Sequence, residues 1–218
     1  MNTGRNLRVG KRFPKDLLTK TERRIFERLT TPEKIQDYLN SLPYNAEDSV
    51  QSVRSSIAAG RVHCLEGALV AAAILWYHNE TPLLLDLQTT SDDSDHVVAL
   101  FKRDGLYGAL SSTHHSVLRY RDPIYKTMRE VALSYFHEYF LDSGIKTMRA
   151  YSQKPFALSQ HRYDWLFGDD DLYDLGAKID DMPHTPIAPS RTISRLRKAD
   201  KVEREAGKLL SILRQTKK

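Results

Sequence analysis

One cysteine stands where a thiol could act as a nucleophile. Cys64 is the single cysteine among 218 residues and opens the apolar run "CLEGALVAAAILWY", which is typical of a buried helix. The unpaired backbone N–H groups and the positive dipole end of a helix N-terminus favour a thiolate there. The same N–H groups can stabilise the oxyanion that forms when a thiolate attacks a carbonyl. A lone buried cysteine is more often an inert core residue. A catalytic role for Cys64 therefore requires a nearby residue that can accept the proton of its thiol.

His96 is the candidate base. It follows the polar loop "TTSDDSD" and precedes "VVALF", so we expect it to open a strand over 96–102 at the rim of a sheet. The sequence "RDG" at 103–105 predicts a tight turn into a second strand over 105–112. The resulting antiparallel hairpin places the end of the second strand opposite His96.

The end of that second strand supplies candidates for the third residue of a catalytic triad with Cys64 and His96. Ser111, Ser112 and His114 stand near the position opposite His96. A group there can hold the second imidazole nitrogen, as the third residue of a nucleophilic triad does. We expect the orienting group to come from Ser111, with Ser112 or Asp86 as alternatives, and Cys64 Sγ to lie within about 3–5 Å of the imidazole ring.

Periodicity and turn-forming residues predict elements in an order typical of the α+β class. Helices are expected at 14–29, 32–42, 48–59, 64–77, 123–141 and 191–218, and strands at 82–88, 96–102 and 105–112. The order predicts a central helix, opened by Cys64, that packs on a small antiparallel sheet and is flanked by other helices.

The charge of the chain is unevenly distributed. The formal net charge is +5, but lysine and arginine gather at both ends and the middle is acidic. We therefore divide the chain into a basic N-terminal extension (1–30), a central domain (31–189) and a basic amphipathic C-terminal helix (190–218).

Three segments, "CLEGAL", "DHVVALF" and "DGLYGALSST", together resemble the transglutaminase-like superfamily, whose members share a papain-like fold. The resemblance covers about residues 60–115 and implies that Cys64 is the nucleophile and His96 the base. The third strand of that family typically ends in aspartate, whereas hydroxyl residues stand at 111–113 here. A hydroxyl orients an imidazole without adding charge to stabilise its cation, so Asp86 and Asp95 are alternative partners.

The resemblance implies a cysteine-dependent acyl-transfer enzyme. Such an enzyme attacks a peptide, amide or ester carbonyl, passes through a thioester and acts as a hydrolase, deamidase or peptidase. The alternative is a catalytically silent domain of the same fold that binds a protein or nucleic acid through its basic ends.

Other classes of function are disfavoured. No apolar run approaches the ~20 residues that cross a bilayer, and one cysteine forms no internal disulfide, so we expect no membrane span and a cytoplasmic location. The segment "STHHS" lacks the spacing of zinc motifs, and "DDD" at 169–171 lacks the glycine and glutamate of a calcium loop. The sequence predicts no metal and no cofactor.

The C-terminal helix is the expected site of macromolecular contact. Leu209, Leu210 and Leu213 give it an apolar stripe beside its basic residues. A protein groove would bury that stripe, whereas nucleic acid would leave it exposed. We therefore favour a protein partner or a homo-oligomer over nucleic acid.

Overall fold

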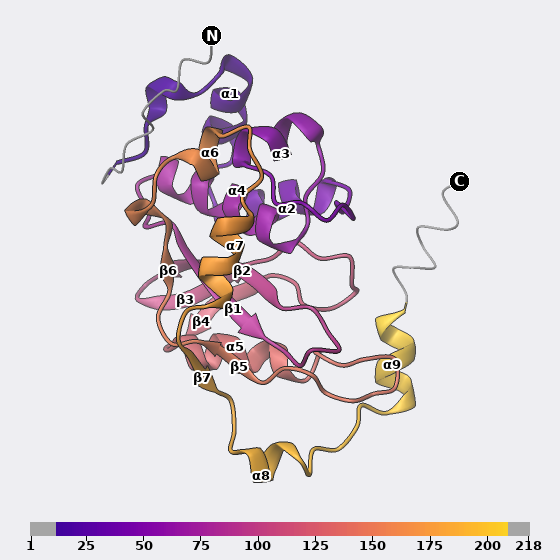
Figure 1. Ribbon diagram of the computed structural model, residues 1–218. Coiled ribbons are helices and arrows are strands. Elements are labelled where there is room, and N and C mark those ends of the chain that lie inside the picture. Colours follow the sequence, from indigo (N-terminus) through magenta and orange to yellow (C-terminus); the bar gives the residue numbers. More distant parts are fainter. Residues whose placement is uncertain (1–11, 209–218) are drawn as a thin grey trace, which may run out of the picture.

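The computed structural model describes residues 12–208. A sheet of antiparallel strand pairs runs through the middle, with helices on both faces (Figure 1). The helices are α1 (Lys20–Arg28), α2 (Pro32–Ser41), α3 (Val53–Ala59), α4 (Cys64–Tyr77), α5 (Met128–Phe136), α6 (Asp164–Phe167), α7 (Tyr173–Asp180), α8 (Ser190–Ile193) and α9 (Lys201–Gly207). The strands are β1 (Leu83–Gln88), β2 (His96–Arg103), β3 (Leu106–Leu110), β4 (Arg121–Tyr125), β5 (Ala150–Ser152), β6 (Phe156–Ala157) and β7 (His184–Pro186). The α+β class and the Cys-headed helix on an antiparallel sheet are confirmed.

The sheet has the order β4-β3-β2-β1-β5-β7, and β6 also pairs with β1. Side chains alternate between its faces, so two apolar clusters form. Val97 and Leu84 pack with α4 on one face, and Val98 and Leu85 pack with α5 on the other. By the same alternation His96 belongs to the α5 face and Asp86 to the α4 face.

The central helix α4 is apolar on all sides, and each residue from Leu65 to Tyr77 is buried. A capping box fixes its N-terminus, because Glu66 accepts from the His63 N–H at 2.9 Å and His63 Nδ1 accepts from the Leu65 N–H at 3.2 Å. Glu66 is fully buried and also accepts from the side chain of Asn45 at 3.1 Å. The first turn that carries the thiol is therefore held by hydrogen bonds on several sides.

The hairpin between β2 and β3 forms where the sequence predicts it. Asp104 and Gly105 have φ values of 52° and 81°, the left-handed conformation that a two-residue hairpin turn requires. The register pairs Ala99 with Leu110, which brings the residues after β3 alongside the start of β2.

The helix predicted over 123–141 is wrong. Residues Arg121–Tyr125 form β4 instead, at the edge of the sheet where the missing N–H of Pro123 is tolerated. The helix starts only at Met128, after Thr127 caps it by accepting from the Glu130 N–H at 3.2 Å. The Asp-Pro pair, interpreted as a helix start, is part of a strand.

The continuous C-terminal helix over 191–218 is also wrong within the described residues. Two short helices, α8 and α9, are separated by a non-helical stretch. Asp200 starts the second one by accepting from the Val202 N–H at 2.9 Å, a capping signal inside the expected helix. Leu209, Leu210 and Leu213 lie outside the described residues.

Residues before position 30 contribute to the core. Phe13 and Phe26 contact the rings of Trp76 and Tyr77 near the C-terminal end of α4. Short 3₁₀ turns occupy Lys15–Leu17 and Leu158–Gln160.

Within residues 12–208, no helix has the length and apolar character needed to cross a membrane.

Candidate active site

Cys64 and His96 both line a cavity of about 670 Å³. They are the first residues of α4 and β2, so the two elements meet with their N-termini at this rim. Cys64 is half-buried, and His96 is 4% exposed. Cys64 Sγ lies 4.0 Å from the carbonyl oxygen of Asp95. The structure brings both sequence-predicted residues to one cavity, while their separation of about 3–5 Å stays a prediction.

Ser111 is bonded to the imidazole, and its geometry assigns the imidazole tautomer. Ser111 Oγ lies 2.8 Å from His96 Nε2 and donates its own proton to the Leu118 carbonyl at 2.5 Å. A hydroxyl has one proton, so this oxygen accepts from His96 Nε2–H. Neutral His96 therefore keeps its lone pair on Nδ1, the atom that can take a proton.

Leu118 supplies that carbonyl from an unusual backbone conformation. Its φ of 60° lies in the left-handed region, which is uncommon for a bulky residue. Its N–H donates to Glu138 Oε2 at 2.9 Å, and Glu138 is paired with Arg121 at 2.6 Å. Strained residues held by their surroundings cluster at functional sites. Here the conformation aims a carbonyl at the hydroxyl that orients His96.

Gln36 is a site residue that the sequence did not reveal. From α2, its Oε1 accepts from the Ser111 N–H at 3.0 Å and its Nε2 donates to the Ser111 carbonyl at 2.8 Å. Both residues are buried, so this pair of bonds fixes the backbone of the orienting serine. A glutamine three residues before Leu39, on the buried side of an amphipathic helix, was the available signal.

Gly67 allows the first turn of α4 to approach the end of β3. A Cβ at this position would collide with the side chain of Ser112. The glycine therefore allows the close contact between the first turn of α4 and the residues that follow β3.

Burial keeps both reacting groups neutral in the free site. It raises the pKa of the Cys64 thiol, and the backbone N–H groups of Val97 and Leu65 offset this only in part. Burial likewise lowers the pKa of His96 to about 3, opposed by the Leu118 carbonyl. The expected thiolate at a helix N-terminus is therefore not the favoured form, because desolvation outweighs the N–H groups.

The two aspartates named as alternative partners are engaged elsewhere. Asp86 Oδ2 bonds to His184 Nε2 at 2.8 Å, and Asp95 Oδ1 accepts from the N–H and hydroxyl of Thr89 at 2.7 and 2.8 Å. Burial raises the pKa of Asp86 to about 7, with Asp95 and Asp180 raising it further and His184 lowering it. The third position of the site is thus held by a hydroxyl.

The helix α9 closes one side of the cavity. Arg204 lines the cavity and donates to the Asp142 carbonyl at 3.2 Å, and Ser116 Oγ donates to the Ala206 carbonyl at 3.0 Å. The described part of the C-terminal segment therefore docks on its own chain. The cavity lining also includes Tyr44, whose ring contacts His114 at a centroid distance of 4.5 Å.

Comparisons with known proteins add little to this geometry. No protein-family model matches the chain, and no curated protein sequence matches it. A solved structure titled "Legionella pneumophila LapG (EGTA-treated)" is similar over 44% of this chain and 66% of its own, at 16% identity and a TM-score of 0.33. The chain thus spans just under two thirds of that structure. The description of the site rests on the residues of this chain alone.

Proposed function

We propose that this chain is a cysteine-dependent acyl-transfer enzyme of the transglutaminase-like superfamily. The observation that carries the proposal is the imidazole of His96, held by Ser111 with its lone pair on Nδ1, in the cavity that also holds Cys64. Nucleophile, base and orienting group are the three roles of a triad.

The reaction starts from the neutral pair. As the thiol attacks a carbonyl carbon, its proton passes to His96 Nδ1 and the C–S bond forms. Backbone N–H groups around the sulfur, among them that of Leu65, support the negative charge. The imidazolium then protonates the leaving amine, the C–N bond breaks and a thioester remains. Water attacks the thioester with His96 as base, which releases the acid and restores the thiol.

The substrate class follows from this chemistry. Thioester formation suits an amide, peptide or ester carbonyl, and water is the default acceptor, so hydrolysis is preferred over transfer to an amine. The nucleophile must stay reduced, which favours the cytoplasm as the location. No described part of the chain provides a cofactor for this step, and the proposed steps require none.

A panel of peptidyl and aminoacyl aminomethylcoumarin amides tests the proposal. We expect release of coumarin by the full chain and loss of at least ~1000-fold of that rate in Cys64→Ser. His115→Gln is the matched control for His96→Gln, because His115 also lines the cavity but lies outside the proposed triad. If Cys64→Ser retains the wild-type rate on every active substrate, the proposal is wrong.

The rival function is a catalytically silent binding domain. The observation that favours it is the neutral, buried state of both groups, with a hydroxyl in place of an aspartate. Iodoacetamide labelling across pH separates the two readings. A silent domain would alkylate Cys64 slowly, with a thiol pKa above the ordinary ~8.5 and no dependence on His96. An enzyme would lose labelling at neutral pH in His96→Gln.

A further inference from the structure

The helix α9 brings a cation to the wall of the candidate active-site cavity. Arg204 lines the cavity that also holds Cys64 and His96. Its Nη1 donates to the Asp142 carbonyl at 3.2 Å, and the guanidinium is paired with no carboxylate among residues 12–208. A guanidinium stays charged throughout the physiological pH range. This wall of the cavity therefore carries a positive charge without an ion-pair partner in the described part of the chain.

The donors of Arg204 that remain without partners form one edge of the guanidinium. Of its nitrogens, only Nη1 is hydrogen-bonded to residues 12–208, and Nε is buried. The N–H groups of Nε and Nη2 point in parallel and match the two oxygens of one carboxylate. A buried donor without a partner is rare in folded proteins, so this edge points to a ligand.

The backbone around Arg204 holds its side chain in place. Gly144 has a φ of 82°, and a Cβ there would lie only 3.2 Å from Arg204 Cδ. The Gly144 carbonyl accepts from the Ala199 N–H at 2.8 Å, just before α9 begins. Ser116 Oγ donates to the Ala206 carbonyl at 3.0 Å, near the end of the helix. The guanidinium is thus positioned before a ligand arrives, which lowers the entropic cost of binding one.

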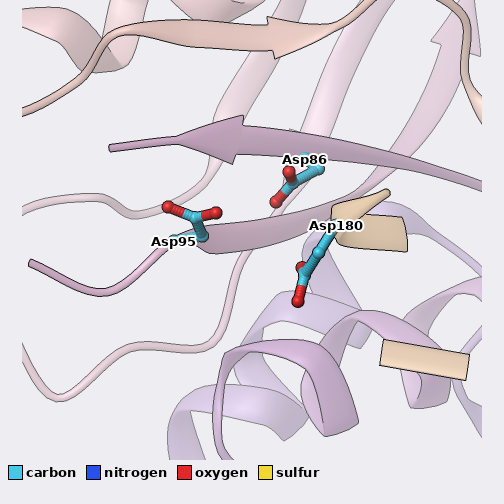
Figure 2. A group of neighbouring side chains, drawn as sticks. All are labelled: Asp86, Asp95 and Asp180. Carbon is cyan, nitrogen blue, oxygen red and sulfur yellow. The ribbon is translucent and has the colours of Figure 1, made fainter. Parts of the chain in front are cut away.

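The acidic residues of the cavity differ from Arg204, because most of them are already engaged. Three carboxylates of the lining accept hydrogen bonds from side chains of the protein: Asp93 from Thr147, Asp95 from Thr89 and Glu138 from Arg121. In Figure 2 the carboxylate of Asp95 also faces that of Asp86. Asp142 is exposed, so its carboxylate is solvated. The half-buried guanidinium is therefore the charged group of the lining with the greatest need of a partner.

We propose that Arg204 is a specificity-determining residue that binds a carboxylate of the substrate. The preferred substrates are then peptides or amides that carry an acidic side chain or a free terminal carboxylate near the carbonyl that Cys64 attacks. A cavity of about 670 Å³ has room for both groups, since pockets for small ligands measure about 300–1,000 Å³. The cleavage of these substrates rests on the proposed function, whereas their binding does not.

Binding is measured by calorimetry on the full chain carrying Cys64→Ser, so that hydrolysis does not interfere. The probes are blocked alanine pentapeptides with a central glutamate, glutamine or lysine, and the glutamine peptide with a free C-terminal carboxylate. Arg204→Gln removes the charge, and Arg204→Lys keeps the charge without the paired donors. Lys201→Gln is the matched control, because Lys201 is an exposed cation of α9 that does not line the cavity. The unfolding midpoint of each variant is recorded beside its affinity.

We expect a carboxylate peptide to bind about tenfold more tightly than the blocked glutamine peptide. Whether the glutamate or the free-acid peptide shows this preference identifies the source of the carboxylate. The preference should disappear in Arg204→Gln, weaken in Arg204→Lys and persist in Lys201→Gln. The proposal is overturned if neither carboxylate peptide binds more tightly than the blocked glutamine peptide, if the lysine peptide binds best, or if Arg204→Gln keeps the preference.

The proposed function fails separately from this inference. A carboxylate preference that depends on Arg204, in a protein that cleaves none of the aminomethylcoumarin amides, would contradict only the catalytic proposal. Turnover that depends on Cys64 but is equal for acidic and neutral substrates would contradict only the role of Arg204.

Discussion

Two polar clusters lie near the start of β2, and they differ in the groups that they gather. The triad cluster, Cys64, His96 and Ser111, is neutral, and its serine and imidazole are joined by hydrogen bonds. The aspartate cluster, Asp86, Asp95 and Asp180, gathers three carboxyl groups and leaves one buried oxygen of Asp86 without a hydrogen-bond partner among residues 12–208 (Figure 2). In the proposed function the first moves a proton, whereas the second brings three carboxyl groups within 4.8 Å of one another.

Both clusters meet at one rim of the sheet, on opposite faces of the paired strands β1 and β2 at His96 and Asp86. Side chains of adjacent strands alternate between faces, so His96 and Asp86 point to opposite sides although their residues are near neighbours in the register. Burial disfavours the charged form in both clusters, so it lowers the pKa of His96 and raises that of Asp86. Each prediction below alters one cluster and leaves the other in place.

Among variants that keep both Cys64 and His96, the largest effect is expected from Ser111, the proposed orienting residue. Ser111→Ala removes the acceptor of His96 Nε2–H, so the imidazole loses its fixed tautomer and orientation. We expect kcat to fall about tenfold to a hundredfold with KM little changed, and the pH profile to shift. Ser111→Thr, which keeps a hydroxyl, should recover most of the rate, and Ser112→Ala should leave it near wild type. A merely structural role would instead lower stability without changing the pH profile.

The next largest effect is expected at Gly67, where α4 contacts Ser112. Gly67→Ala places a methyl group against the Ser112 side chain, which the packed helix can accept only by shifting. We expect a loss of about 1–3 kcal/mol in the free energy of urea unfolding. Gly176→Ala is the control, because in α7 its new methyl group would meet only Leu65 at 3.8 Å. Equal stability of the two variants would contradict the close approach of α4 and the end of β3.

Gln36 tests how the orienting serine is held. Gln36→Leu keeps much of the side-chain volume but leaves the N–H and carbonyl of Ser111 without these partners. We expect a loss of about 1–3 kcal/mol in unfolding free energy, together with lower activity. Asn40→Ala is the control, since Asn40 contacts Gln36 but not Ser111. If only Asn40→Ala lowers the free energy of unfolding, the hydrogen bonds from Gln36 to Ser111 do not contribute to stability as expected.

The smallest and most discriminating effects are two opposite pH dependences, measured by urea unfolding in EDTA. Between pH 3.8, the ordinary pKa of aspartate, and about 7, native Asp86 holds a proton that the unfolded chain has already lost. The contribution of Asp86 to the free energy of unfolding is therefore lost as the pH rises through this range. Between pH 6.5, the ordinary pKa of histidine, and about 3, the unfolded chain binds a proton at His96 that the native protein does not bind. The contribution of His96 to the free energy of unfolding is therefore lost as the pH falls through this range.

Two substitutions separate these dependences. Asp86→Asn should remove the loss of stability on raising the pH, and His96→Gln should remove the loss on lowering it. Stability curves of both variants parallel to that of the wild type would show that the two groups do not titrate as their burial requires.

Local patterns predicted the elements that carry Cys64, His96 and Ser111, because helix starts and tight turns depend on neighbours in sequence, whereas the catalytic roles of these residues stay a prediction. The apolar helix at Cys64 and the tight turn at Asp104 and Gly105 were enough to place α4 and the β2–β3 hairpin. The register pairs Ala99 with Leu110, so position 111 falls two residues short of the point opposite His96. Gln36 and Asp180 reach their clusters from distant helices, and no spacing along the chain encodes such contacts. The helix expected at Pro123 failed because an Asp-Pro pair suits an edge strand as well as a helix start.

The central claim is that Cys64 is acylated with the help of His96, and a burst experiment with 4-nitrophenyl acetate tests it most directly. We expect a burst of nitrophenol close to one equivalent, with the acetyl group found on Cys64 by mass spectrometry. The burst should disappear in Cys64→Ser, slow at least about tenfold in His96→Gln and persist in His115→Gln. Acetylation of Cys64 at the same rate in wild type and His96→Gln would contradict the account.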